Sequence, residues 1–302
     1  MSEEKEILDL QKLTTVLMDY GWFVPPFVIQ SEVKALSALT AKVAASPPTT
    51  DADKRKVEDE IHTHLMDAAL SPQLRARFVW YAMRTPHLRE YSHIIESAVH
   101  AYYKRQYAAT VCLLLTAFEG VTLSIYGYTL GGAVKKPSFA HLTATLQNVP
   151  LVAINPVMNA FQDVMRDALG AFVDRWLYAN TQNADFTLSV LNRHYVLHGM
   201  EPGNFYRPQD VHRLLFAMDI LIELTAIREG CWRASVPDDA EEYEERRVFY
   251  SELRDGEMPI GVAGTREQQL LEQHTKYIPP QREAIIERHS QHRRSAARPS
   301  PD

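Results

Sequence analysis

Apolar residues recur at spacings of three and four positions over most of this 302-residue chain. Such spacing places them on one face of an α-helix, as in the first segment, where Ile7, Leu10, Leu13 and Leu17 form a stripe. No segment shows the strict alternation of a half-buried strand, and only 12 glycines interrupt the pattern. The sequence therefore predicts an all-α fold, built as a helical bundle.

Local start and stop signals divide this pattern into separate helices. Pro156 suits a first helical position, Ser138 is a helix-start signal, and Gly199 is typical of the residue that ends a helix. Asp51 is expected to cap the N-terminus of the third helix. The predicted helices cover residues 4–20, 28–45, 53–70, 91–103, 107–125, 138–148, 156–178, 186–198 and 209–228.

Helical pattern and charge together divide the chain into three regions. Residues 87–230 are expected to form one bundle domain, and residues 1–86 an N-terminal helical extension. Residues 231–302 contain the nearly all-charged stretch 238–247 and end in a tail with almost no apolar periodicity. We therefore predict a charged peripheral C-terminal extension with a disordered tail.

Charge and cysteine content narrow the functional classes. The chain has 32 basic and 38 acidic residues, a formal net charge of −6, so it has no global positive field that attracts nucleic acid. Any polyanion site must therefore be local. The two cysteines, Cys112 and Cys231, are too few for a disulfide framework, and the acidic start is unlike a signal peptide. These features predict a cytoplasmic protein.

Residues 107–127 are apolar and long enough to resemble a membrane span. Glu119 lies near the centre of this segment, where an unpaired carboxylate would be costly in hydrocarbon. A helix buried in a bundle explains the segment better, so no membrane is expected as a partner.

The densest group of functional side chains lies at the end of the predicted helix 186–198. It reads Leu191-Asn192-Arg193-His194-Tyr195-Val196-Leu197-His198-Gly199. Arg193 and His198 would lie roughly 140° apart around a helix and ~7.5 Å apart along it, so they could flank a groove. An arginine forks onto phosphate oxygens, and a histidine of near-neutral pKa exchanges a proton with a ribose hydroxyl or a leaving oxygen. The pair therefore suits phosphoryl transfer.

The segment from Arg193 to His198 resembles the signature of the HEPN superfamily of helical-bundle ribonucleases and their inactive relatives. That signature is an arginine, then an asparagine, aspartate or histidine, then three residues and a histidine. The preceding helices, Gly199 and the following long helix are similar to the family context. The apolar helix that carries Glu119-Gly120 also resembles the earlier acidic helix of many HEPN bundles. The resemblance covers residues 87–230.

The resemblance implies a metal-independent endoribonuclease that works as a homodimer, with two motifs facing each other across a basic cleft. Arg193 and His198 would be catalytic and His194 a polar helper, while Asn192 would support the site or bind phosphate. Glu119 would orient Arg193 or His198. The adjacent 2′-hydroxyl would cleave RNA to a 2′,3′-cyclic phosphate, with no cofactor. Such proteins commonly act as toxins or in antiviral defence, so an antitoxin or regulatory protein is a further expected partner.

Other interpretations of the same residues stay open. Arg193 and His198 could be cations that the dipole favours at a helix C-terminus, without any function. Glu119 could merely form a salt bridge to a neighbouring helix. His194 and His198 are four residues apart, a metal-ligand spacing, with His212 as a conceivable third zinc ligand. The bundle could also be a catalytically inactive HEPN-like module that holds a nucleotide or a protein partner.

Overall fold

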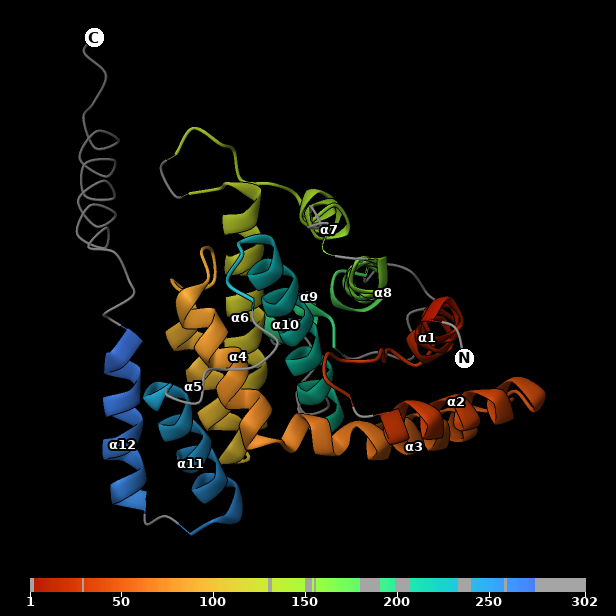
Figure 1. The fold of residues 1–302 in the computed structure, drawn as a ribbon, viewed down its shortest axis with the longest axis horizontal. Coiled ribbons are helices and arrows are strands. Elements are labelled where there is room, and N and C mark those ends of the chain that lie inside the picture. Colours follow the sequence, from red (N-terminus) through yellow and green to blue (C-terminus); the bar gives the residue numbers. More distant parts are fainter. Residues whose placement is uncertain are drawn as a thin grey trace.

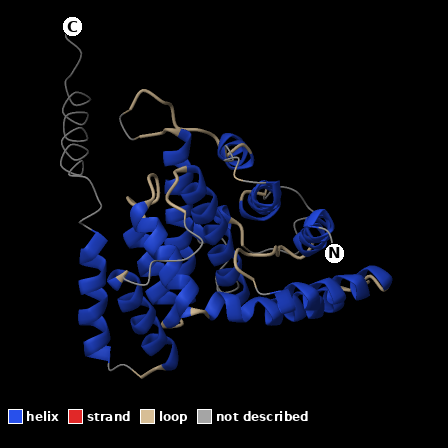
Figure 2. Cartoon of the chain, in the orientation of Figure 1, coloured by secondary structure: helices blue, strands red, loops and turns tan. Residues whose placement is uncertain are grey.

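In the computed structural model, the described residues are 3–28, 30–129, 132–149, 154, 156–179, 191–198, 207–232, 240–257 and 260–274. Within these ranges every regular element is a helix and no strand is present, which confirms the predicted all-α class (Figure 2). The α-helices are α1 (Glu3–Met18), α2 (Gln30–Ala45), α3 (Asp51–Leu70), α4 (Pro72–Arg84), α5 (Ser92–Tyr103), α6 (Tyr107–Tyr126), α7 (Phe139–Gln147), α8 (Pro156–Phe172), α9 (Arg193–His198), α10 (Pro208–Arg228), α11 (Glu241–Asp255) and α12 (Ile260–Gln273). A π-helical turn (Val173–Leu177) continues α8.

Helix α10 is the central element of the bundle (Figure 1). Every side chain from Asp210 to Ile227 is buried, because α3, α4, α6 and α8 pack around it. A helix that is buried on all sides must also bury its polar residues, and these need partners inside the protein. One such pair joins Asp219 to Arg75 of α4 at 2.5 and 2.8 Å, with both side chains at most 3% exposed.

The N-terminal helices pack onto this bundle. Helices α2 and α3 form a hairpin that projects from it, and α1 lies against α8 (Figure 1). Helix α4 lies in a region, residues 71–86, for which the sequence predicted no helix. It begins with Pro72 after the N-cap Ser71, and the Ser71 hydroxyl accepts a hydrogen bond from the Leu74 amide. Its Phe78, like its Arg75, is buried. Helix α4 is therefore packed into the bundle core, while the boundary at residue 86 stays a prediction.

The charged C-terminal region contributes two helices to the bundle. Helix α11 packs against α4 and α5, and α12 packs against α5. Phe249, Tyr250 and Leu270 are fully buried in these contacts. The charge pattern suggested a peripheral extension, but part of that charge is buried, because Arg246 of α11 is paired inside the protein. Residues 275–302, which include the predicted disordered tail, lie outside the described residues.

The third helix is capped by a different residue from the one predicted. The Thr50 hydroxyl accepts a hydrogen bond from the Asp53 amide at 3.1 Å, so Thr50 is the N-cap and Asp51 is the first helical residue. Both residue types cap helices well, and the backbone before Asp51 decides which of them stays outside the helix.

Helix α6 is the segment that resembles a membrane span. Among the described residues, it is the one helix long and apolar enough to cross a bilayer. It lies between α5, α7 and α10, and its Leu114, Phe118 and Val121 are buried in the core. These contacts are those of a core helix in a bundle. The cytoplasmic location stays a prediction.

Candidate functional site

The structure brings Glu119 of α6 and Arg193 of α9 together. The guanidinium directs both Nη2 and Nε to the same carboxylate oxygen, Glu119 Oε2, at 2.7 and 2.9 Å. The Arg193 side chain is 18% exposed and that of Glu119 is 14% exposed, so the ion pair lies at the edge of the core and keeps contact with solvent. Glu119 and Arg193 are 74 positions apart in the sequence, and the fold joins them at the predicted site.

Gly120 explains how α6 comes close enough to α5 to hold Glu119 in this place. A Cβ atom on Gly120 would lie 2.1 Å from Cε1 of Tyr91, the residue before α5. Real carbon atoms do not approach so closely, so only glycine permits this packing. The glycine after Glu119 therefore has a structural reason of its own.

Arg193 stands at the beginning of α9, whereas the sequence placed it near the end of a helix over residues 186–198. Leu191 and Asn192 are not helical, and residues 186–190 lie outside the described residues. The Asn192 carbonyl accepts from the Val196 amide at 3.0 Å, which forms the first turn of α9. At a helix N-terminus the dipole disfavours a cation. The interpretation of Arg193 as a favourable C-terminal cation therefore does not fit, and Glu119 supplies its compensating charge.

Asn192 lies inside the protein rather than at the surface. Its side chain is 1% exposed, and its Nδ2 donates to the Ala179 carbonyl at 2.8 Å. This contact joins the start of α9 to the chain that follows the π-helical turn. Of the two roles expected for Asn192, support of the site agrees with this geometry and phosphate binding does not.

Tyr178 is a neighbour of the ion pair that sequence reasoning missed. Burial raises the pKa of its hydroxyl; the nearby Glu119 carboxylate raises it further, and the Arg193 guanidinium lowers it. The hydroxyl therefore stays protonated at neutral pH. Its only sequence signal is its place at the end of the predicted helix 156–178, which does not indicate the direction of its side chain.

His194 and His198 both lie in α9, but their side chains lie outside the described residues. Their predicted roles, and the zinc site they would form, stay predictions. The proposed third ligand, His212, belongs to another contact. Its Nδ1 is hydrogen-bonded to His62 Nε2 and its Nε2 to the Tyr102 hydroxyl, each at 2.8 Å.

Burial and the neighbouring cations favour the neutral form of His212. Burial is the main cause that lowers its pKa to about 3, with smaller effects from His62 and Arg75. Both ring nitrogens of His212 are therefore hydrogen-bonded, one to His62 and the other to Tyr102. Among the described residues, no group of three or more histidine, cysteine, aspartate or glutamate side chains could hold a metal ion.

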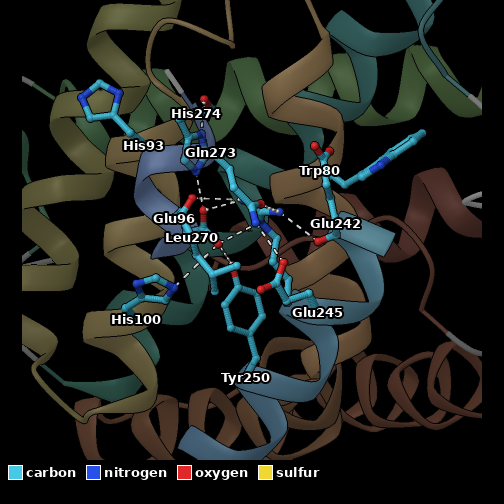
Figure 3. A network of polar contacts seen from close by, with 12 residues as sticks. Trp80, His93, Glu96, His100, Glu242, Glu245, Tyr250, Leu270, Gln273 and His274 are labelled. Atoms are coloured by element: carbon cyan, nitrogen blue, oxygen red, sulfur yellow. Dashed lines mark hydrogen bonds and ion pairs between the residues drawn. The ribbon is translucent and has the colours of Figure 1, made fainter. Parts of the chain in front are cut away.

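A second polar cluster, which no sequence pattern indicated, surrounds Glu96 of α5 (Figure 3). The Glu96 carboxylate accepts hydrogen bonds from Arg246 Nη2 at 3.1 Å, from the Tyr250 hydroxyl at 2.6 Å, and from His274 Nε2. Arg246 Nε also lies 2.9 Å from it in an ion-pair contact. His100 lies 3.7 Å from the same carboxylate. All five side chains are at most 1% exposed, so the cluster joins α5, α11 and the end of α12 without contact with solvent.

The ionisation of this cluster follows from its contacts. Burial opposes the charge on Glu96, but Arg246 and the two histidines outweigh it and hold the pKa of Glu96 well below its usual range. Burial also opposes protonation of His100, but ion-pair contacts with Glu267 at 3.4 Å and Glu96 at 3.7 Å raise its pKa. These enclosed charges hold helices together, and because the bundle seals them from solvent, they do not form a substrate site.

A shallow groove of about 280 Å³ lies between α1 and α8, lined by residues that include Thr14, Asp167 and Arg175. None of its lining residues comes from α6 or α9, so it is separate from the Glu119–Arg193 pair.

No protein-family model, curated protein or solved structure matches this chain.

Proposed function

We propose that this protein is a HEPN-type, metal-independent endoribonuclease. The observation that carries the proposal is the Glu119–Arg193 ion pair, which joins the motif helix α9 to the acidic, apolar helix α6. The resemblance to the HEPN signature implied that Glu119 orients Arg193 or His198. One charge-assisted hydrogen bond, from Nε to Glu119 Oε2, together with the close approach of Nη2 to the same oxygen, restricts the orientation of the guanidinium.

The chemistry assigned to these residues is transesterification. The 2′-hydroxyl of a ribose attacks the adjacent phosphorus and gives its proton to a histidine, and the 5′-oxygen of the next nucleotide leaves with a proton. His198 is the acid–base residue and His194 the polar helper. The Arg193 guanidinium stabilises the charge that develops on the phosphate oxygens. The products are a 2′,3′-cyclic phosphate and a free 5′-hydroxyl.

RNA is the partner, and a second copy of this chain completes the site. Because the whole chain carries a net charge of −6, attraction of RNA depends on local cations. One motif supplies one arginine, whose charge Glu119 already compensates in part. Two motifs across a twofold axis would supply two arginines and a stronger local field. Toxin or antiviral-defence activity, with an antitoxin or regulatory protein as partner, is the setting that the family resemblance suggests.

The compensation of Arg193 by Glu119 also favours a second candidate, a catalytically inactive module that binds a nucleotide or assembles with another protein. An arginine whose donors face a carboxylate is a common structural contact between helices. The two candidates differ in what His198 does: the enzyme requires it, and the binding module does not.

The deciding experiment is RNA incubation in EDTA with the wild type, His198→Ala and His64→Ala. His64 lies on the projecting α2–α3 hairpin, where it faces Glu32 at 3.4 Å, and serves as the matched histidine control. We expect cleavage by the wild type and by His64→Ala, and none by His198→Ala. Cleavage that EDTA abolishes and zinc restores would favour the metal-site interpretation. Equal cleavage by all three proteins, or none by any, would contradict the proposal.

A further inference from the structure

Asn192 connects two segments that meet at the candidate site. On one side, its backbone carbonyl accepts from the Val196 amide at 3.0 Å and so begins α9. On the other side, its side-chain Nδ2 donates to the Ala179 carbonyl at 2.8 Å. The residue that follows it is Arg193, whose guanidinium faces Glu119. The two hydrogen bonds of Asn192 therefore fix the backbone directly before Arg193.

The partner of Asn192 belongs to a well-held part of the chain. Ala179 follows the π-helical turn, whose Val173 and Leu177 are buried in the core. The Tyr178 amide donates to the Val173 carbonyl at 2.8 Å, which closes this turn. Such π-helical turns often occur at functional sites, because the extra residue redirects the chain. Here the turn directs Tyr178 and Ala179 toward the start of α9.

We propose that Asn192 is a positioning residue that fixes the start of α9 against this turn and thereby sets the guanidinium of Arg193 against Glu119. It does not bind phosphate. A phosphate ligand must reach solvent, whereas the Asn192 side chain is 1% exposed and its amide donates to Ala179. The catalytic consequence of this role rests on the proposed function, while the structural consequence can be measured without RNA.

The structural test follows the Nε–H proton of Arg193, which donates to Glu119 Oε2 at 2.9 Å. Its NMR signal is identified by its loss in Arg193→Lys. We expect this proton to exchange with solvent several-fold faster in Asn192→Ala than in the wild type. Asn192→Asp, which keeps the size of the side chain but lacks the Nδ2 donor, is measured in parallel and should shift exchange in the same direction.

Asn148→Ala is the matched control. Asn148 also donates its Nδ2 to an alanine carbonyl, that of Ala144 at 2.7 Å, but it is exposed at the end of α7. We expect Arg193 exchange in this variant to equal that of the wild type. Unchanged exchange in both Asn192 variants, or an equal increase in Asn148→Ala, would overturn the positioning role.

The kinetic test separates positioning from phosphate binding. A positioning role predicts that Asn192→Ala lowers kcat about tenfold to a hundredfold and leaves KM nearly unchanged. A phosphate ligand predicts instead a raised KM and weaker inhibition by inorganic phosphate, and that result would overturn the proposal. If the wild type cleaves no RNA but Arg193 exchange still depends on Asn192, the proposed function fails and the positioning role stands.

Discussion

Arg246 of α11 and Glu96 of α5 form an ion pair in which neither side chain has any exposed surface. Arg246 Nε lies 2.9 Å from Glu96 Oε1, and its Nη2 donates to Oε2 at 3.1 Å. The Tyr250 hydroxyl donates to the same carboxylate at 2.6 Å. A charge without a partner at this depth is costly, so each partner depends on the other. The C-terminal helices are thereby tied to the central bundle.

The first prediction concerns this pair. Glu96→Gln removes the negative charge and leaves the Arg246 guanidinium buried without it, which should lower the free energy of unfolding by about 3–5 kcal/mol. Denaturant unfolding measures the change. The matched control is Glu244→Gln, because Glu244 pairs with Arg247 on the same helix but is 53% exposed. Equal destabilisation by the two variants would show that burial does not decide the effect.

The second prediction concerns pH. The contact with His100 is the main cause that lowers the pKa of Glu267 to about 2, and contacts with Glu267 and Glu96 raise the pKa of His100 against the effect of burial. The stability from Glu267 is therefore present above its ordinary pKa of 4.5 and lost as pH falls toward 2. The stability from His100 is present below its ordinary pKa of 6.5 and lost as pH rises through its raised value.

Attachment of α12 to α5 should therefore be strongest between about pH 4.5 and 6.5. Amide hydrogen exchange of α12 across pH 4 to 9, corrected for the intrinsic rate, measures this dependence. His100→Gln removes the titrating group and should abolish the decline at alkaline pH. A decline that persists in this variant would assign it to another group.

The third prediction tests the close approach at Gly120. Gly120→Ala would place a Cβ atom 2.1 Å from Cε1 of Tyr91, so the Tyr91 ring or helix α6 must shift, and stability should fall by about 1–3 kcal/mol. Gly264→Ala in α12 is the control, because a Cβ atom at residue 264 would meet no neighbouring atom within 4 Å. That change should stabilise the protein by about 0.5–1 kcal/mol through helix propensity. Thermal melts of both variants measure these changes. If Gly120→Ala also raised the melting temperature, helix propensity would outweigh the contact with Tyr91.

The fourth prediction distinguishes the two roles of Arg193. If its guanidinium holds the scissile phosphate, Arg193→Lys keeps the charge but loses the planar fork, so cleavage should fall by about a hundredfold or more. The melting temperature should change little. Arg175→Lys is the control, because Arg175 is 58% exposed on the π-helical turn. Near-wild-type cleavage by Arg193→Lys would contradict the phosphate role, and a large melting shift would show that the residue is structural first.

The fifth prediction concerns assembly. Because one motif supplies one arginine and the chain as a whole is acidic, the cleaving species should be a dimer. Light scattering of the purified protein, run beside cleavage at decreasing protein concentration, should show that activity falls as the dimer dissociates. A strictly monomeric protein that still cleaves RNA would refute this arrangement.

The sequence by itself determined the helical class, because the three- and four-residue spacing of apolar side chains is a local property that survives into the fold. It also located α6 and α10 closely, since both are long and strongly apolar. It missed α4, although Ser71 and Pro72 are start signals. It also misjudged α11, because the dense charge of this helix is typical of a solvated segment and the carboxylate that pairs with Arg246, Glu96, lies 150 positions away in α5.

At the candidate site, the sequence pointed to Glu119 and Arg193 through a resemblance, but spacing within one helix cannot predict a contact between residues 74 positions apart. The same holds for Asn192, for which the resemblance left two roles open, support of the site and phosphate binding. Only the tertiary structure decided that it faces inward, because its donor finds the Ala179 carbonyl across a turn that local pattern does not encode. Helices follow from nearby residues, whereas the pairing of buried polar groups depends on how the whole chain packs.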